Sequence, residues 1–570
     1  MSVPEQPSSP PSATRASAST VPPAQSLPPQ ARSEATRLLC AGVYFDGDFR
    51  RAVIEQLVEH EERPIAPSLG IDALPVLAHA VRARRQEIGT GLALLALWVT
   101  FVVLGITGTG SDPATAPIPW SLAYAVVCVL AWGVRGNKGS VFALGRSVLK
   151  EATRGRLKSV LPVLPVAAAL GYWALALIAL FGGADVWAAV VLPLLMVLPV
   201  WAHRQRVTAL MRHGLSRQAF DRAPRERLPD TAQYRRIGQA IAREQYAGLA
   251  IYDPFRPFVG AGEPYKPWSF VVELQPGARK QLRPDAAGGG VATLTGRDVI
   301  DLIRPRLEDL RTSAAATSRD RLRSLEVDEM VYLPVGVARD LVDYDPDNVR
   351  HHREGAVGEG AEARRHFLRV RVGAWDEQIG ISLLVRVHTQ GGVLVLEVVP
   401  HVLTPVRPEY KSVDVLAERL DDGPLRDAVR ALVTAPSAGF AAGVCLVTTA
   451  YSIGRTWLNI PEFAPPDGPD RSVRELGSAQ EVSLFQEMDI SRYVKTLQDR
   501  ITGGVREALR VRGYETGEFE KYVINVGEGG VFIGQMSGGA VASGEGALAK
   551  QVDSRRSRTA AKSETGGGLR

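Results

Sequence analysis

The sequence has little cysteine and none of the common catalytic motifs. Its 570 residues include three cysteines, Cys40, Cys128 and Cys445, all in apolar surroundings, which argues against a disulfide framework or a cysteine-based zinc site. The GxSxG, HExxH and CxxC motifs do not occur. Residues 133–140 lack the Walker spacing, and residues 544–549 match GxGxxA in spelling only, with no strand–turn–helix pattern around them. We therefore expect that the protein is not an enzyme and has no catalytic residues, cofactor-binding residues, metal ligands or cofactor.

Charge is absent from four long apolar segments. They contain no Asp, Glu, Lys, Arg or His and cover residues 88–107, 118–134, 160–181 and 186–202. A helix of about 20 residues spans the roughly 30 Å hydrocarbon core of a bilayer, so these segments predict an α-helical membrane bundle of four transmembrane helices. Ion and proton pathways normally need ionisable groups inside the membrane, and their absence disfavours a transporter or channel.

Basic residues lie at alternate ends of the apolar segments. The connections at 108–117 and 182–185 contain none, whereas the loop at 135–159 is rich in them. Further arginines precede the first segment and follow the fourth: Arg82, Arg84, Arg85, Arg204, Arg206 and Arg212. The positive-inside rule places both termini on the cytoplasmic side. The 135–159 loop is also predicted to contact anionic lipid, with plain topogenic charge as the favoured alternative.

The remaining sequence divides by composition. Residues 1–33 are rich in Pro, Ser and Ala and poor in large apolar residues, so we expect a disordered tail. Residues 34–86 predict a small helical cytoplasmic module, and 203–250 a basic helical juxtamembrane stretch. The later parts are expected to be an α+β domain (251–455), a linker with an amphipathic helix (456–522), a glycine-rich β-prone motif (523–549) and a disordered tail (550–570).

Period-two alternation predicts strands in the 251–455 domain. In FLRVRV, Leu368, Val370 and Val372 alternate with Arg369 and Arg371, the pattern of a half-exposed strand. Gly391 and Gly392 predict a hairpin turn, so the fold class is α+β with an antiparallel sheet. The other strands are expected at 269–274, 329–335, 380–388 and 393–399, a helix opened by a capping box at Thr295 and Asp298, and another helix at 412–434.

Two later segments predict helices of different kinds. Residues 438–454 are uncharged, and a fifth membrane span and a buried helix are both open, with the buried helix favoured because Gly, Ala and Thr are frequent. A fifth span would move everything after Arg455 to the other side of the membrane. From Asp489 to Val511, apolar residues at helical spacing predict an amphipathic helix that Gly503 and Gly504 weaken.

Three polar groups are candidates for ligand binding. Asp343, Asp345, Asp347 and Glu354 have the spacing of an EF-hand loop, but Asn348 occupies the glycine position, so a solvated acidic loop is favoured. Histidines nearby raise the alternative of a transition-metal site: His351, His352 and His366. A set of basic residues could line one sheet face and bind an anion, an ordinary solvated face being the simpler interpretation: Arg369, Arg371, Arg386 and His388.

The glycine-rich motif carries a family resemblance. Residues 523–549, VINVGEGGVFIGQMSGGAVASGEGALA, are short β-prone pieces separated by glycines. They are similar to the glycine-rich C-terminal motifs of actinobacterial signalling proteins, some of them amyloid-forming, which implies self-association; a small terminal hairpin is the alternative. The chain has only 10 lysines among 67 basic residues and resembles uncharacterised actinobacterial multi-pass membrane proteins, which implies a bacterial cytoplasmic membrane.

These features predict an integral membrane protein that anchors a large cytoplasmic domain for sensing, scaffolding or assembly. The net charge of +6 is spread along the chain, so no nucleic-acid partner is expected. The alternatives are a transporter or channel component, and a membrane-tethered enzyme with an unrecognised site in the α+β domain.

Overall fold

A computed structural model describes residues 29–107, 117–135, 163–182, 186–276, 294–317, 320–336, 342–359, 364–374, 379–418, 424–458, 468–517 and 519. The glycine-rich motif at 523–549, the C-terminal tail, most of the N-terminal tail and nearly all of the 135–159 loop lie outside the described residues.

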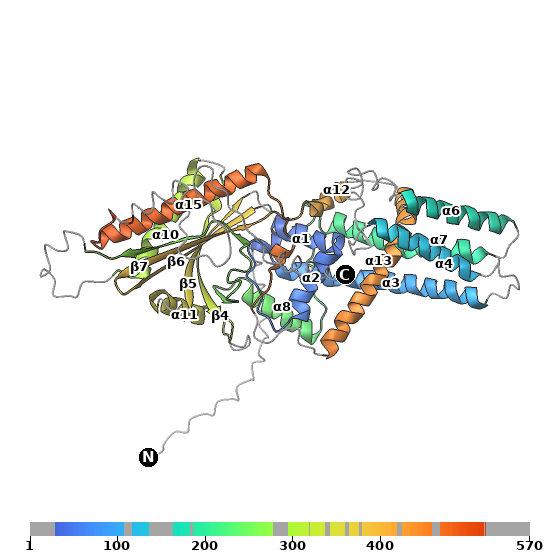
Figure 1. The fold of residues 1–570 in the computed structure, drawn as a ribbon, viewed down its shortest axis with the longest axis horizontal. Coiled ribbons are helices and arrows are strands. Elements are labelled where there is room, and N and C mark those ends of the chain that lie inside the picture. The colour runs from blue at the N-terminus through green and yellow to red at the C-terminus, as the bar shows by residue number, and fades with distance from the viewer. Residues whose placement is uncertain are drawn as a thin grey trace, which may run out of the picture.

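The strands lie at one end of an elongated molecule and the long apolar helices at the other, with shorter helices between them (Figure 1). The helices are α1 (Glu34–Phe45), α2 (Gly47–Ile54), α3 (Ala73–Thr107), α4 (Pro117–Arg135), α6 (Val163–Phe181), α7 (Trp187–His213), α8 (Ala232–Glu244), α10 (Gly296–Thr317), α11 (Pro346–Glu359), α12 (Ser412–Glu418), α13 (Pro424–Leu458), α14 (Val473–Leu476) and α15 (Leu484–Val511). The strands are β1 (Leu249–Tyr252), β2 (Glu263–Pro264), β3 (Trp268–Glu273), β4 (Glu326–Pro334), β5 (Arg365–Ala374), β6 (Ile379–Gln390) and β7 (Val393–Leu403).

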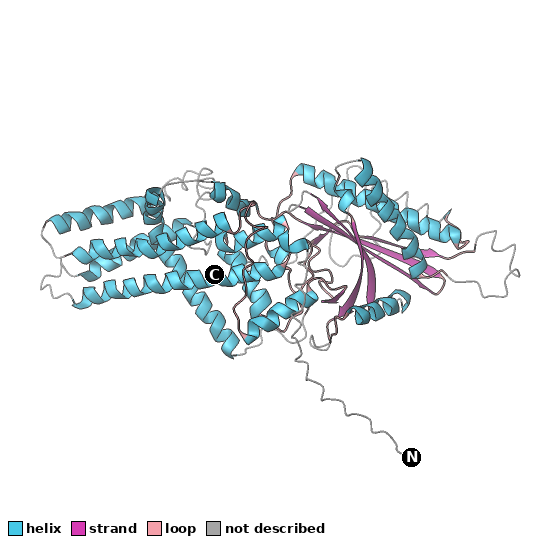
Figure 2. Ribbon diagram, turned by 180° about the vertical axis from the view of Figure 1, so that it is seen from behind, coloured by secondary structure: helices cyan, strands magenta, loops and turns pink. Residues whose placement is uncertain are grey.

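Helices α3, α4, α6 and α7 lie side by side in a bundle, one for each predicted apolar segment (Figures 1 and 2). By length and composition, four described helices are able to cross a membrane: α3, α6, α7 and α13. Helix α4 has a shorter apolar stretch, Trp120–Gly133. The predicted fold class, a helical membrane bundle with an α+β domain, is confirmed.

Aromatic rings pack in the centre of the bundle. The ring centroids of Tyr124 and Tyr172 are 5.2 Å apart, and the Tyr172 hydroxyl donates a 2.7 Å hydrogen bond to the Ala189 carbonyl. This buried hydroxyl is therefore satisfied within the bundle. The outside of α6 exposes large aliphatic side chains such as Leu170 and Ile178, as expected for a surface that meets lipid rather than water.

The strands form one mixed sheet in the order β1-β4-β5-β6-β7-β2, with β3 also paired to β7. Strands β4 to β7 are successive antiparallel neighbours, and the β6–β7 turn contains Gly391 and Gly392 with φ of 59° and 79°. Strand β1 instead pairs in parallel with β4. The sheet is therefore not purely antiparallel as predicted, because the chain passes through β2, β3 and α10 before β4 returns beside β1.

Helices α10 and α15 cover one face of this sheet. The capping box is present at the start of α10, where the Thr295 N–H donates to Asp298 at 2.9 Å and the Asp298 N–H donates to Thr295 at 3.2 Å. The predicted amphipathic helix is α15, which shares one core with the sheet and α10 through Ile490, Val494, Leu497, Ile501, Val505 and Leu509. The helix predicted beyond a linker is thus packed on the strands that precede it.

A second core, here called the junction core, lies between the bundle and the sheet. It combines α1, α2, the first turns of α3, the last turns of α7, and α8, for example through Leu39, Phe49, Leu77, Met211 and Ile241. Residues that flank α13 on both sides complete it: Val406, Tyr410, Val413 and Val473. The sequence regions 34–86 and 203–250, which the membrane segments separate, therefore fold against each other.

Helix α13 runs in a different direction from the bundle. Figures 1 and 2 show it crossing α3, α4 and α7 steeply instead of lying alongside them. It contains the whole 438–454 segment within a helix of 35 residues. The single helix predicted at 412–434 is divided, because α12 ends at Glu418 and α13 begins at Pro424.

Candidate functional site

A concentrated group of charges surrounds Glu329 in the middle of β4. Alternation along the strand places Glu329 on the same face as Val327 and Val331, the face that α10 covers. In the antiparallel register Glu329 lies opposite Leu368, and Val331 opposite His366. The side chain of Glu329 is only 7% exposed, so its charge needs partners inside the protein.

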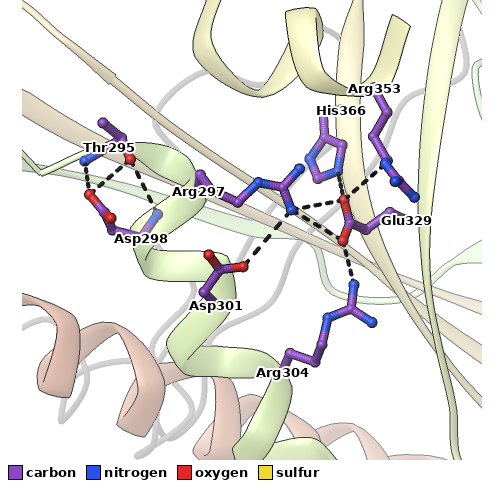
Figure 3. A network of polar contacts seen from close by, with 8 residues as sticks. All are labelled: Thr295, Arg297, Asp298, Asp301, Arg304, Glu329, Arg353 and His366. Atoms are coloured by element: carbon purple, nitrogen blue, oxygen red, sulfur yellow. Dashed lines mark hydrogen bonds and ion pairs between the residues drawn. The ribbon is translucent and has the colours of Figure 1, made fainter. Parts of the chain in front are cut away.

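Four basic side chains converge on this carboxylate, and we call the five residues the Glu329 cluster (Figure 3). Arg297 of α10 donates to both oxygens, at 3.2 and 3.1 Å, and Arg304 of the same helix contacts Oε1. His366 Nε2 lies 3.0 Å from Oε2, and Arg353 Nε of α11 lies 3.6 Å from it. One carboxylate thus connects α10, α11 and β5 to β4.

The cluster fixes the ionisation of its members. Burial alone would raise the pKa of Glu329, but the hydrogen bond with His366 and the charge of Arg297 lower it to about 2. Burial lowers the pKa of His366, and Glu329 offsets this only in part. With a pKa of about 2, Glu329 is ionised at neutral pH and does not have the pKa near 7 that suits general acid–base catalysis. The geometry is that of a clamp between elements.

The basic residues predicted to line a sheet face lie on the opposite face from Glu329, because their positions in the strands are one residue out of phase with it. Each arginine is paired with an acid of the neighbouring strand: Arg369 with Asp328 at 3.0 Å, Arg371 with Glu326 at 2.9 Å and Arg386 with Glu397 at 3.3 Å. Burial and the charge of Arg386 lower the pKa of His388. The three arginine charges are compensated, which weakens the anion-binding interpretation.

The acidic segment at 343–354 does not have the shape of an EF-hand loop. Helix α11 begins at Pro346, so Glu354 lies more than two turns inside a helix. The Asp345 N–H donates to the Asp343 side chain at 2.9 Å and the Asp347 N–H to that of Asp345 at 3.2 Å. These acids serve as local turn and helix-start acceptors.

The three histidines are divided between two elements. His351 and His352 lie in α11, with ring centroids 6.3 Å apart, whereas His366 lies in β5 and bonds Glu329. Among the described residues, no group of three or more His, Cys, Asp or Glu side chains is placed to hold a metal ion.

A second group of charges ties the junction core together around Arg37 of α1. Its side chain is 1% exposed and pairs with Glu34 at 2.6 Å and with Asp414 of α12 at 2.9 Å. It also donates a 2.8 Å hydrogen bond to the Leu215 carbonyl, just beyond α7. Nearby, Arg50 of α2 pairs at 2.5 Å with Glu87 of α3. Loss of one partner would leave a charge inside the protein uncompensated.

The segment after β7 docks on the same core. Arg407 pairs with Asp46, the N-cap of α2, at 2.5 Å, and the Tyr410 hydroxyl donates to the same carboxylate at 3.2 Å. The Tyr410 ring lies directly over α1, where a Cβ added at Gly42 would be 2.6 Å from it. At Gly42 the lack of a side chain therefore permits the close approach.

Glu475 of α14 connects the junction core to the loop before β3. One carboxylate oxygen accepts from the Gly260 N–H at 2.7 Å and the Gly262 N–H at 3.1 Å. The other accepts from the Ser472 N–H at 2.9 Å, which completes a capping box. A single side chain thereby joins the return segment after α13 to the sheet domain.

Comparison with protein families finds a match for the part of the chain that contains strands β3 to β7. The match covers residues 267–540, from the start of β3 through α13 and α15 into the glycine-rich motif. The matching family is the AbeC-like domain, and we use this name below for the matched region. A search of curated proteins and a search of solved structures each found no match. The AbeC-like domain includes the whole Glu329 cluster as well as α13 and the residues that flank it.

Sequence reasoning missed both Glu329 and Arg37. A signal for Glu329 was present, since an acid stands between Val327 and Val331 at a position where β4 should be apolar. No local signal marks Arg37, because its partners Asp414 and Leu215 are distant in the sequence.

Proposed function

We propose that this protein is a membrane-anchored scaffold that holds its AbeC-like domain in a fixed position at the cytoplasmic face of a bacterial membrane. The domain serves sensing or assembly there and does not catalyse a reaction. The basic residues beside alternate ends of the apolar segments support the orientation.

The junction core is the observation that carries the proposal. Helices α3 and α7 continue from the bundle into this core without a break, and Arg37 and Arg50 pair inside it. Residues on both sides of α13 are part of the same core. A domain on a flexible linker would not share a buried core with its anchor, so this arrangement favours a role that depends on position.

The alternatives have less support. A transporter or channel would need charged or titratable groups along the bundle, yet the four predicted membrane segments contain no Asp, Glu, Lys, Arg or His. A membrane-tethered enzyme would need a group poised to exchange protons near neutral pH, and the low pKa of Glu329, about 2, does not suit this task.

The test is a distance measurement between two spin labels in the full chain, reconstituted in lipid vesicles. In a background where the three cysteines are replaced, labels at Gln218→Cys, just after α7, and Val271→Cys, on β3, report the position of the domain relative to the anchor. We expect one narrow distance distribution. Arg37→Ala should broaden it, because it removes the buried side chain that links α1 to Asp414 of α12 and to the Leu215 carbonyl. Glu34 and Asp414 then keep the longer pairs with the exposed Arg217, at 3.3 and 3.5 Å.

The control is Arg51→Ala, since Arg51 is half exposed and forms only a surface pair with Asp48 at 3.3 Å. This variant should keep the narrow distribution. A broad distribution in the unmodified chain would show that the domain moves freely and would overturn the proposal.

A further inference from the structure

Helix α13 begins and ends on the same side of the bundle. Val406, before the helix, forms a β-bridge with Ser478, after it, and the Ala479 N–H donates a 2.7 Å hydrogen bond to the Pro405 carbonyl. Helix α15, which follows, is buried against strands that precede α13. A helix that crossed the bilayer once would leave these partners on opposite sides of the membrane. The apolar length of α13 is therefore not explained by a fifth membrane span.

The contacts of α13 place it at the end of the bundle next to the junction core. Trp132, near the end of α4, and Gly91, near the start of the apolar part of α3, both lie at this end. Three contacts show where α13 lies along the axis of the bundle. Phe440 contacts Trp132 with 4.5 Å between ring centroids, Leu446 lies against Gly91, and the Ser452 hydroxyl bonds Glu59 of the junction. At this level a bilayer around the bundle changes from acyl chains to headgroups.

Two faces of α13 differ in side-chain size. The face toward the bundle consists of small buried residues, which allow helices to approach closely: Ala431, Ala435, Ala438, Ala442, Cys445 and Thr449. The opposite face, here called the outer stripe, carries larger apolar side chains at helical spacing: Val429, Val433, Val447 and Tyr451. Val433, Val447 and Tyr451 are each 70% exposed.

The charge pattern of α13 is unlike that of a helix that faces water. The 24 residues from Ala431 to Gly454 contain no charged side chain, and Arg430 and Arg455 bracket them. Helix α10, which is of comparable length, carries eight charged residues between Gly296 and Thr317. An exposed apolar stripe of this extent indicates a nonpolar partner.

We infer that α13 is an in-plane membrane helix, with its outer stripe in the acyl-chain boundary of the leaflet that faces the AbeC-like domain. The lipid is the occupant because the stripe continues the exposed apolar surface of the bundle, as at Leu92 and Leu95 of α3. The helix is about 52 Å long at 1.5 Å per residue, so it forms a bar across the base of the bundle. It sets the depth at which the domain meets the membrane.

The experiment measures depth along the helix in the full chain, reconstituted in phosphatidylcholine–phosphatidylglycerol vesicles. Nitroxide labels are placed singly by Val433→Cys, Phe440→Cys, Val447→Cys and Tyr451→Cys in the cysteine-free background, and their collision with oxygen is compared with that of a water-soluble nickel reagent. We expect similar, shallow depths at all four positions. A crossing helix would give depths that rise steadily from one end to the middle and fall again.

Sidedness provides the second measurement. Glu481→Cys, after α13, should react with an impermeant thiol reagent from the same side as the exposed control Gln218→Cys. Reaction of the two from opposite sides would overturn the inference. It would also be overturned if the four labels were fully accessible to the nickel reagent, as on a surface that binds a soluble protein, or if their depths followed a crossing profile. The spin-label distance between Gln218 and Val271 tests the proposed scaffold separately, because it does not depend on the depth of α13.

Discussion

At the scale of single residues, the Glu329 cluster concentrates three arginines and a histidine on one carboxylate. Replacing Glu329 by Gln removes the charge that compensates Arg297, Arg304 and Arg353, while the shape of the side chain is kept. Because loss of one partner of a buried pair costs about 3–5 kcal/mol, we expect a marked loss of stability. Thermal unfolding in detergent micelles should show a clearly lower midpoint for Glu329→Gln.

Glu326→Gln is the matched control for this prediction. Glu326 belongs to the same strand and pairs with Arg371, but its side chain is 47% exposed. A pair of this kind contributes at most about 1 kcal/mol, so the control should unfold close to the unmodified protein. Equal shifts of the unfolding midpoint in the two variants would mean that the Glu329 cluster stabilises the fold no more than a surface pair does.

Glu329 should also make the stability of the fold depend on pH in the acid range. The pKa of Glu329 falls from 4.5 to about 2 on folding, so its stabilising contribution is complete above pH 4.5 and is lost as the pH falls toward 2. Glu329→Gln cannot titrate and should lack this part of the acid dependence. Unfolding midpoints measured between pH 5 and pH 2.5 should converge for the two proteins, whereas parallel curves would refute the assignment.

At the scale of elements, α10 and α15 are held together by a glycine contact. A Cβ added at Gly504 would be 2.8 Å from the Cα of Ile303, whereas one added at Gly503 would meet only the end of the Arg306 side chain at 3.1 Å. Alanine favours a helix by about 1 kcal/mol over glycine. We therefore expect Gly503→Ala to be neutral or stabilising and Gly504→Ala to be destabilising.

These two neighbouring variants control each other, since their effect on helix propensity is the same. Thermal unfolding followed by circular dichroism should show that the two substitutions shift the unfolding midpoint in opposite directions, or at least by clearly different amounts. Similar positive shifts would mean that α15 does not approach α10 as closely as the glycine contact requires. The sequence alone treats both glycines as weak points of a helix, and only the packing separates them.

Whether an element can be predicted depends on whether the residues that determine it are close together in the sequence. Strands β5 to β7 and the amphipathic helix α15 were predicted because alternation and helical spacing are local patterns. The parallel pairing of β1 was not, because Leu249–Tyr252 is short and its partner lies about 80 residues later. Hydropathy gives the apolar length of α13 but not its direction, which depends on distant contacts such as Val406 with Ser478.

At the scale of the whole molecule, Glu475 is one of the contacts that join the sheet to the junction core. The chain leaves the sheet after β7, contributes to the junction core, runs through α13, and returns through α14 to α15. Because Glu475 joins α14 to the backbone of the loop before β3, it couples the return segment to the sheet. Candidate sites of this kind cannot be predicted from sequence, since each partner is an ordinary residue in its own segment.

Glu475→Ala should therefore loosen the domain from the junction. The substitution leaves the N–H groups of Gly260, Gly262 and Ser472 without their acceptor, and each unsatisfied buried donor costs about 1–3 kcal/mol. The Ser472 N–H belongs to the peptide bond after Arg471, and local opening of this turn exposes that bond to protease. We expect trypsin to cut the full chain after Arg471 several-fold faster than in the unmodified protein, whereas Glu481→Ala, at an exposed position beyond α14, should leave the rate unchanged. Equal cleavage rates in all three proteins would mean that this turn is held by other contacts, and that the domain does not depend on Glu475 for its attachment.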